Sequence, residues 1–197
     1  MKSKILILII LFFTAFKISN AQDRKSLNKA IFKVLNAYEN KDDKTMNAMI
    51  SKDIGIVFLY RRGAHDNITK RDSFSFENPV PEYLPYEKIG KTATKIKHQK
   101  LPEFECSVEK FNLTPGIYCQ KTTKERNLST VAQHENEFLD ANWTPEHFKL
   151  FNKIEDNGYR IIAYNRNDID SIFIFHLTWL NNKWYLTVID RFEVCSA

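Results

Sequence analysis

Two strongly apolar runs joined by a pair of asparagines dominate the last third of the chain, in residues 172–192 (IFIFHLTWLNNKWYLTVIDRF). Asn181 and Asn182 suit the positive-φ positions of a two-residue type I′ turn. That turn would pair Trp179 with Trp184 and fix the register, because a slip by one residue exchanges the two faces of a hairpin. Counting back from the turn places most of the large apolar side chains on one face: Phe173, Phe175, Leu177, Trp179, Trp184, Leu186 and Val188. We therefore expect the hairpin to supply much of a hydrophobic core.

The first 21 residues have the pattern of a cleavable signal peptide. Two lysines precede an apolar run over residues 5–16, and Ser19-Asn20-Ala21 fits a small-x-small cleavage site before Gln22. The apolar run is shorter than the roughly 20 residues that a membrane span needs. We therefore expect an exported protein, periplasmic or extracellular, with no membrane span after cleavage. Residues 22–197 would form a single domain.

The charge balance argues against a nucleic-acid-binding protein. The chain has 29 Lys and Arg against 24 Asp and Glu, but three of the lysines lie in the expected signal peptide. Without them the balance is 26 against 24, a net charge of +2. Nucleic-acid-binding domains instead concentrate a basic face. We therefore expect no nucleic-acid partner.

All three cysteines follow the expected cleavage site, and an oxidising compartment permits disulfides. Cys106 and Cys119 flank a predicted hairpin over residues 104–122, which makes them the first choice for a disulfide. A bridge closing so short a loop would contribute about 3 kcal/mol on the chain-entropy model. Cys195 would then be a free thiol. Pairing of Cys106 or Cys119 with Cys195 stays open as the alternative.

Periodic apolar patterns predict an α+β fold, with a curved antiparallel sheet wrapped over N-terminal and central helices. Helices are expected near residues 24–38, 43–50, 130–139 and 145–157, and strands at 54–60, 104–122, 159–164 and in the terminal hairpin. The Asn157-Gly158 pair is expected to end the last helix in a left-handed cap.

Residues 63–100 are predicted to form a long irregular insertion, because prolines and glycines interrupt any regular pattern there. Long loops in compact domains are commonly functional. Tyr83 and Tyr86, in the proline-rich segment Pro79–Tyr86, are therefore candidates for binding a ligand or a partner. The alternative is an ordinary surface loop that packs its own aromatic side chains.

Two segments resemble the nuclear transport factor 2-like superfamily. KVLNAYENKDDKTMNAMISKDIGIVF is similar to its opening, where two helices separated by a short acidic turn lead into the first strand, and NNKWYLTVIDRF is similar to its final hairpin. The resemblance implies a cone-shaped sheet that often encloses a pocket. Residues 61–100 differ from the compact pattern of the family, and we expect them to fill or cover the mouth of the pocket. The whole chain, with its VIDR…CSA ending, also resembles exported proteins of Bacteroidetes-type bacteria, which imply no activity.

Asp190 is the sharpest candidate for chemistry. The register places it beyond the core positions of the hairpin, opposite Phe173, and a desolvated carboxyl group is what proton transfer beside a carbonyl requires. Tyr38, at the end of the apolar stripe of the first helix, would point its hydroxyl into the same cavity. The superfamily includes steroid isomerases, dehydratases, polyketide cyclases and non-enzymatic binding domains. Steroid isomerases place a tyrosine on the first helix and acids on strands, but no motif here matches theirs residue by residue. The alternatives are that an arginine at the sheet rim satisfies Asp190 and that Tyr38 is a core residue.

No motif indicates a metal or a cofactor, and we expect neither. The five histidines are widely separated, and the chain has no glycine-rich phosphate loop and no nucleophile elbow. The sequence favours a non-catalytic exported domain that binds a small apolar molecule or a cell-envelope protein. Two alternatives stay open. One is a lyase or isomerase with Asp190 as acid or base and Tyr38 as polarising hydroxyl, and the other is a partner-binding module acting through Pro79–Tyr86.

Overall fold

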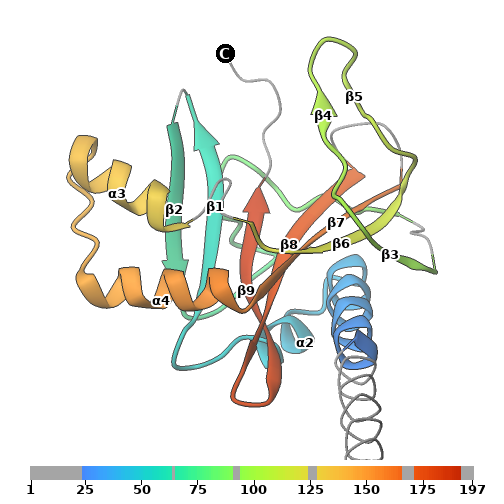
Figure 1. Ribbon diagram of the computed structural model, residues 1–197, viewed down its shortest axis with the longest axis horizontal. Helices are drawn as coiled ribbons and strands as arrows, with labels where there is room; N and C mark the ends of the chain where they lie inside the picture. Colours follow the sequence, from blue (N-terminus) through green and yellow to red (C-terminus); the bar gives the residue numbers. More distant parts are fainter. Residues whose placement is uncertain (1–23, 64, 91–93, 124–127, 166–170, 192–197) are drawn as a thin grey trace, which may run out of the picture.

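The computed structural model describes residues 24–63, 65–90, 94–123, 128–165 and 171–191. Its strands are β1 (Ile56–Arg62), β2 (His65–Arg71), β3 (Ile96–His98), β4 (Phe104–Glu105), β5 (Lys110–Phe111), β6 (Gly116–Lys121), β7 (Gly158–Tyr164), β8 (Ile172–Leu180) and β9 (Lys183–Arg191). Seven of them form one sheet in the order β2-β1-β9-β8-β7-β6-β3, while β4 and β5 form a separate ribbon (Figure 1). The pairs β1–β9 and β3–β6 are parallel and the others antiparallel. The predicted α+β class with a largely antiparallel sheet is confirmed.

Helices cover both faces of this sheet. Residues 24–39 are helical and pack with α2 (Asp43–Ala48) on one face, against alternate side chains such as Phe58. The helices α3 (Leu128–Phe138) and α4 (Pro145–Asp156) pack on the other face, against Val57 and Leu59 (Figure 1). The period-2 alternation of β1 therefore divides the core into two layers. The sequence had led us to expect the N-terminal and central helices on the same face of the sheet. This expectation was wrong, because the two sets of helices lie on opposite faces.

The terminal hairpin has the predicted turn. Asn181 and Asn182 have φ angles of 49° and 59°, and Trp179 lies opposite Trp184. The predicted register holds only as far as Leu177, because a β-bulge then shifts the pairing so that His176 lies opposite Val188.

The bulge changes the face of the sheet on which the last side chains of β9 lie. Val188 was expected among the side chains around Phe173, but it packs on the opposite face with α3 and α4. Asp190 lies opposite Ile174, not opposite Phe173. The extra residue inserted by the bulge reverses the side-chain alternation from this point onward.

Residues 63–100 are more regular than predicted. They contain the edge strand β2, which pairs with β1 along its whole length, and the short strand β3. The sequence of β2, HDNITKR, buries only Ile68, so an apolar alternation could not reveal it. The prediction of a wholly irregular insertion was wrong for this part.

The predicted disulfide between Cys106 and Cys119 is also wrong. Cys119 is a free thiol that is only 2% exposed, within β6 and beneath the helix of residues 24–39. Cys106 is exposed in the turn of the β4–β5 ribbon, so residues 104–122 do not form one hairpin. Pairing of Cys106 with Cys195 remains a prediction, because Cys195 lies outside the described residues.

The predicted end of α4 and the predicted signal peptide remain to be compared with the structure. Asn157 ends α4 with a φ of −112°, so the predicted left-handed cap is absent at this residue. Gly158 is required by close packing instead, because a Cβ there would lie 2.6 Å from the carbonyl oxygen of Ile154. The expected signal peptide lies outside the described residues. Among the residues that the structure describes, no helix is long and apolar enough to cross a membrane.

Candidate functional site

A pocket of about 320 Å³ lies on the sheet face that carries α3 and α4. We call it the Asp190 pocket. Strands β1, β6, β7, β8 and β9 all contribute to its wall, and the segment that follows β3 contributes Leu101. The strand residues that define it are Leu59, Gln120, Arg160, His176 and Asp190.

The polar side chains of the pocket form a row across the sheet. Gln120 of β6 lies opposite Arg160 of β7, and Arg160 lies opposite His176 of β8. Directly paired residues point to the same face, so these three side chains are neighbours. The bulge in the terminal hairpin brings Asp190 of β9 to this face as well. The row therefore depends on the one departure from regular pairing in the hairpin.

Asp190 is held by an ion pair. Arg160 Nη2 donates to Asp190 Oδ2 at 2.8 Å, and the Asp190 side chain is only 1% exposed. The other carboxylate oxygen, Oδ1, is buried and has no hydrogen-bond partner among the described residues. The same holds for Nε2 of His176. Unpartnered buried polar atoms are rare in native structures, so two of them in residues that line one pocket need an explanation.

His176 is neutral in this environment. Burial and, secondarily, the positive charge of Arg160 lower its pKa to about 3. A neutral imidazole has one donor and one acceptor nitrogen. His176 can therefore offer a hydrogen bond in either sense without carrying charge.

Charges at the pocket balance one another. Three basic side chains line it, namely Lys100, Lys121 and Arg160, and so do three acidic ones, namely Glu103, Glu155 and Asp190. Lys100 pairs with Glu103 at 2.7 Å. Glu155 accepts hydrogen bonds from the backbone N–H and hydroxyl of Ser129 at 3.1 and 3.0 Å, while burial raises its pKa. The lining is therefore polar but close to neutral.

Tyr38 lies away from this pocket, on the opposite face of the sheet. Its ring stacks on Phe173 with 3.7 Å between centroids and also contacts Phe76 and Tyr86. Burial raises the pKa of the Tyr38 hydroxyl far above its usual value. Asp190 and Tyr38 are separated by the sheet, so the structure does not assemble the predicted acid–base and polarising pair.

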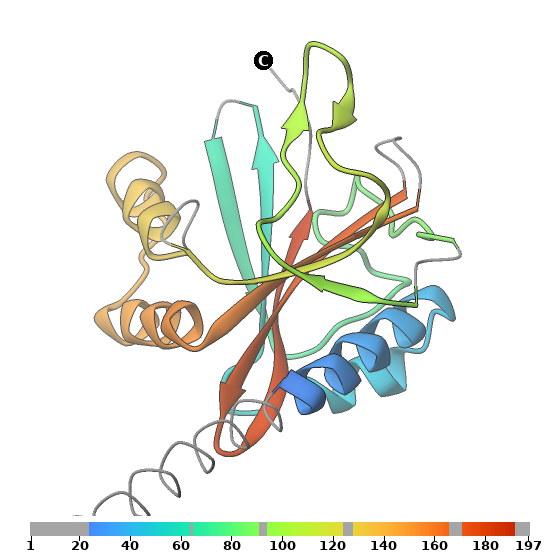
Figure 2. The same cartoon turned by 45° about the vertical axis from the view of Figure 1, so that its right-hand side comes forward.

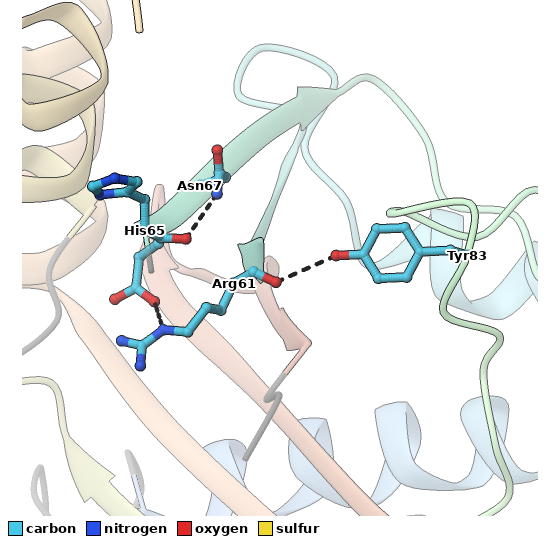
Figure 3. Close-up of polar contacts among 5 residues, drawn as sticks. Arg61, His65, Asn67 and Tyr83 are labelled. Atoms are coloured by element: carbon cyan, nitrogen blue, oxygen red, sulfur yellow. Dashed lines mark hydrogen bonds and ion pairs between the residues drawn. The ribbon is translucent and has the colours of Figure 1, made fainter. Parts of the chain in front are cut away.

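The two tyrosines of Pro79–Tyr86 have different environments. Tyr86 is 5% exposed and packs within an aromatic cluster that includes Phe74. Tyr83 is 56% exposed and donates its hydroxyl to the carbonyl oxygen of Arg61 at 3.3 Å (Figure 3). The guanidinium of Arg61 points the other way and pairs with Asp66 of β2 at 3.0 Å (Figure 3). Of the two candidates, only Tyr83 presents its ring at the surface.

Arg191 fixes this loop to the end of β9. Its guanidinium donates to the carbonyl oxygens of Val80, Leu84 and Pro85 at 3.2, 2.6 and 2.7 Å. The same group lies 4.1 Å from the centre of the Tyr86 ring. The segment is thus held to the rest of the structure by Arg191 and by the packing of Tyr86, while Tyr83 stays exposed.

Sequence reasoning selected Asp190 and missed its partners. Asp190 was expected opposite Phe173, but it lies opposite Ile174, on the face that carries His176. Arg160 had an available signal, because it is a charged residue within the apolar strand GYRIIAY. Among the described residues, no group of three His, Cys, Asp or Glu side chains could hold a metal ion.

No family model, curated protein or solved structure matches this chain. The site must therefore be interpreted from its own geometry.

Proposed function

We propose that the chain is an exported, non-catalytic binding domain that holds a small polar molecule in the Asp190 pocket. The observation that carries the proposal is the pair of unpartnered buried atoms, Asp190 Oδ1 and His176 Nε2, in two residues that line one cavity. Leaving such a group without a hydrogen bond costs about 1–3 kcal/mol. A bound ligand that bonds to both atoms would offset this cost.

The lining indicates what the ligand carries. Asp190 Oδ1 accepts, so the ligand presents a hydrogen-bond donor to it. A guanidinium has five N–H donors, and Arg160 uses one of its nitrogens for the ion pair, so a ligand acceptor fits beside the donor. Because the charges of the lining balance, the best match is a neutral or zwitterionic molecule. Amides and amino acids combine a donor and an acceptor in this way.

The fold and the location are part of the same proposal. Two helices before β1 and the closing hairpin are consistent with a nuclear transport factor 2-like cone, the fold that the sequence resemblance implies. The face of the sheet beneath the helix of residues 24–39 is filled by apolar side chains, among them the rings of Tyr38, Phe74 and Phe173. This filling favours a polar ligand on the other face over the small apolar ligand expected from the sequence.

Native mass spectrometry of the mature chain tests the proposal. Residues 22–197, purified from an oxidising compartment, should carry a small adduct that dissociates on denaturation. The mass of the exported chain, when it is expressed with residues 1–21, tests Gln22 as the mature N-terminus. Asp190→Asn should lose the adduct, whereas Asp72→Asn, which alters a carboxylate that is 96% exposed, should keep it.

A second variant covers the case in which Asp190→Asn unfolds. Leu101→Trp adds bulk at the pocket from a half-buried loop position and leaves the ion pair intact. It should also lose the adduct. A wild-type chain that is bare, and that no amino acid or small amide stabilises in a thermal-shift titration, would overturn the proposal. In that case a protein partner at Pro79–Tyr86 becomes the better hypothesis.

A further inference from the structure

A second and larger hollow lies between the helix of residues 24–39 and the terminal hairpin. Figure 2 shows the first described turns of this helix beside the hairpin formed by β8 and β9. The hollow has a volume of about 1040 Å³. We call it the aromatic groove and define it by the rings along its wall, which are Phe32, Tyr159, Trp179 and Trp184.

The rings of the aromatic groove are fixed before any ligand arrives. Trp184 Nε1 donates to the hydroxyl of Ser26 at 2.9 Å, which ties the hairpin to the helix. Trp179 and Tyr159 pack on Trp184 with centroid distances of 4.9 and 5.7 Å. Trp179 and Tyr159 are only half-buried, so part of each side chain stays open to solvent. Rigid aromatic surfaces bind at low entropic cost because little side-chain freedom is left to lose.

The rim of the groove is strongly basic. Arg24, Lys25, Lys29 and Lys121 are all exposed there, whereas Asp156 is the single acidic residue of the lining. This concentration contrasts with the balanced charges of the Asp190 pocket. A cleft lined by one sign of charge raises the local concentration of ligands of the opposite sign.

We propose that the aromatic groove binds a ring-bearing organic anion. The ring stacks on Trp179 and Tyr159, and its carboxylate or phosphate pairs with Lys25 and Lys29. Acidic saccharides and nucleotides share this chemistry. The proposal is independent of ligand binding at the Asp190 pocket, because Lys25, Lys29 and Trp179 do not line that pocket.

Two probes test the groove in the mature chain, residues 22–197, by isothermal titration calorimetry at low salt. A disaccharide of glucuronic acid represents the acidic saccharides, and uridine monophosphate represents the nucleotides. At least one should bind, and the affinity should fall as salt is added, because exposed charges are screened. Binding of one probe alone identifies the source, and binding of both supports the shared chemistry.

Variants separate binding in the groove from general attraction of anions. The double variant Lys25→Gln/Lys29→Gln should weaken binding by about threefold or more. The matched control is Lys149→Gln/Lys153→Gln, which removes two exposed lysines at the same helical spacing on α4, neither of which lines the groove. Trp179→Ala should weaken binding at least as much as the loss of the two lysines.

Two results would overturn the proposal. One is that neither probe binds the wild-type chain. The other is that the α4 control loses as much affinity as the groove variant. Because the lysine variants alter only exposed side chains, this comparison holds even if Trp179→Ala fails to fold.

Discussion

Arg160 and Asp190 form a 2.8 Å ion pair in which the Asp190 side chain is 1% exposed and the Arg160 side chain 26% exposed. The pair joins β7 to β9 across β8, the strand that carries His176. Because Asp190 is so much more buried than its partner, its charge depends on Arg160 for compensation. Arg160 keeps contact with solvent on one side and with the pocket on the other.

Arg160→Met should therefore destabilise the fold. The substitution leaves a buried carboxylate without a counter-charge, and we expect a loss of about 2–4 kcal/mol in the free energy of unfolding near neutral pH. Urea denaturation measures this loss. Arg62→Met, which alters an exposed arginine at the end of β1, should change stability by less than about 0.5 kcal/mol.

A double-mutant cycle checks that the loss comes from the ion pair. Arg160→Met/Asp190→Asn should cost clearly less than the sum of the two single variants, because the second change removes the stranded charge. Additive losses would show that the two residues act independently.

The terminal hairpin shows how far local sequence signals reach. Asn181 and Asn182 favour positive φ angles, so the turn and its nearest pairs could be predicted. The bulge before Val188 could not, because Thr187 and Val188 both suit a strand and neither marks an extra residue. Thr187 instead bonds Thr178 at 2.7 Å on the face that carries His176. Because the sequence did not reveal the bulge, Asp190 was predicted on the wrong face of the sheet.

Edge strands and long-range contacts are two further features that local sequence patterns did not reveal. β2 is polar because an edge strand buries little, and its pairing with β1 becomes visible only in three dimensions. Glu135 of α3 accepts a hydrogen bond from the backbone of Ile68, a contact between residues 67 positions apart. Helix starts were easier, because their signals are local: a helix was expected near residues 145–157, and α4 does begin at Pro145.

Stability should fall as the pH is lowered through the acid range, and His176 should contribute to the fall. Its pKa is about 3 in the folded chain against 6.5 for the ordinary side chain, so between these values the unfolded state binds the extra proton. Proton uptake by the unfolded state makes stability rise with pH, by at most about 1.4 kcal/mol per pH unit for one group. Urea denaturation at about pH 7 and about pH 4 measures the slope.

His176→Gln supplies the control, because glutamine keeps hydrogen-bonding capacity but does not titrate. Its stability should depend less steeply on pH between these two conditions. Equal slopes for the wild type and the variant would show that His176 does not contribute to the pH dependence. Glu135 and Glu155 act in the opposite direction, because burial raises the pKa of each and so favours the folded state as the pH falls.

Arg191→Lys should loosen Pro79–Tyr86 although it keeps the charge. Lysine has a single ammonium and cannot reproduce the forked donation of the guanidinium to three carbonyl oxygens. We expect a loss of about 1–3 kcal/mol in the free energy of unfolding and faster amide hydrogen exchange in the loop. Arg61→Lys is the matched control, since the Arg61 side chain donates to the partly exposed Asp66 and not to the loop. Unchanged exchange in Arg191→Lys would show that aromatic packing alone holds the loop.

Cys119 should resist thiol reagents until the protein unfolds. The thiol is 2% exposed, and burial raises its pKa to about 12, so almost no reactive thiolate forms at neutral pH. In a titration with a disulfide reagent, the Cys119 thiol should not react in the native chain and should react in denaturant. Peptide mapping identifies the labelled residue. Cys119→Ala should behave as a core truncation that costs about 1–2 kcal/mol, not as the loss of a disulfide. If mapping instead recovers two peptides joined by a disulfide between Cys106 and Cys119, the assignment of Cys119 as a buried free thiol is wrong.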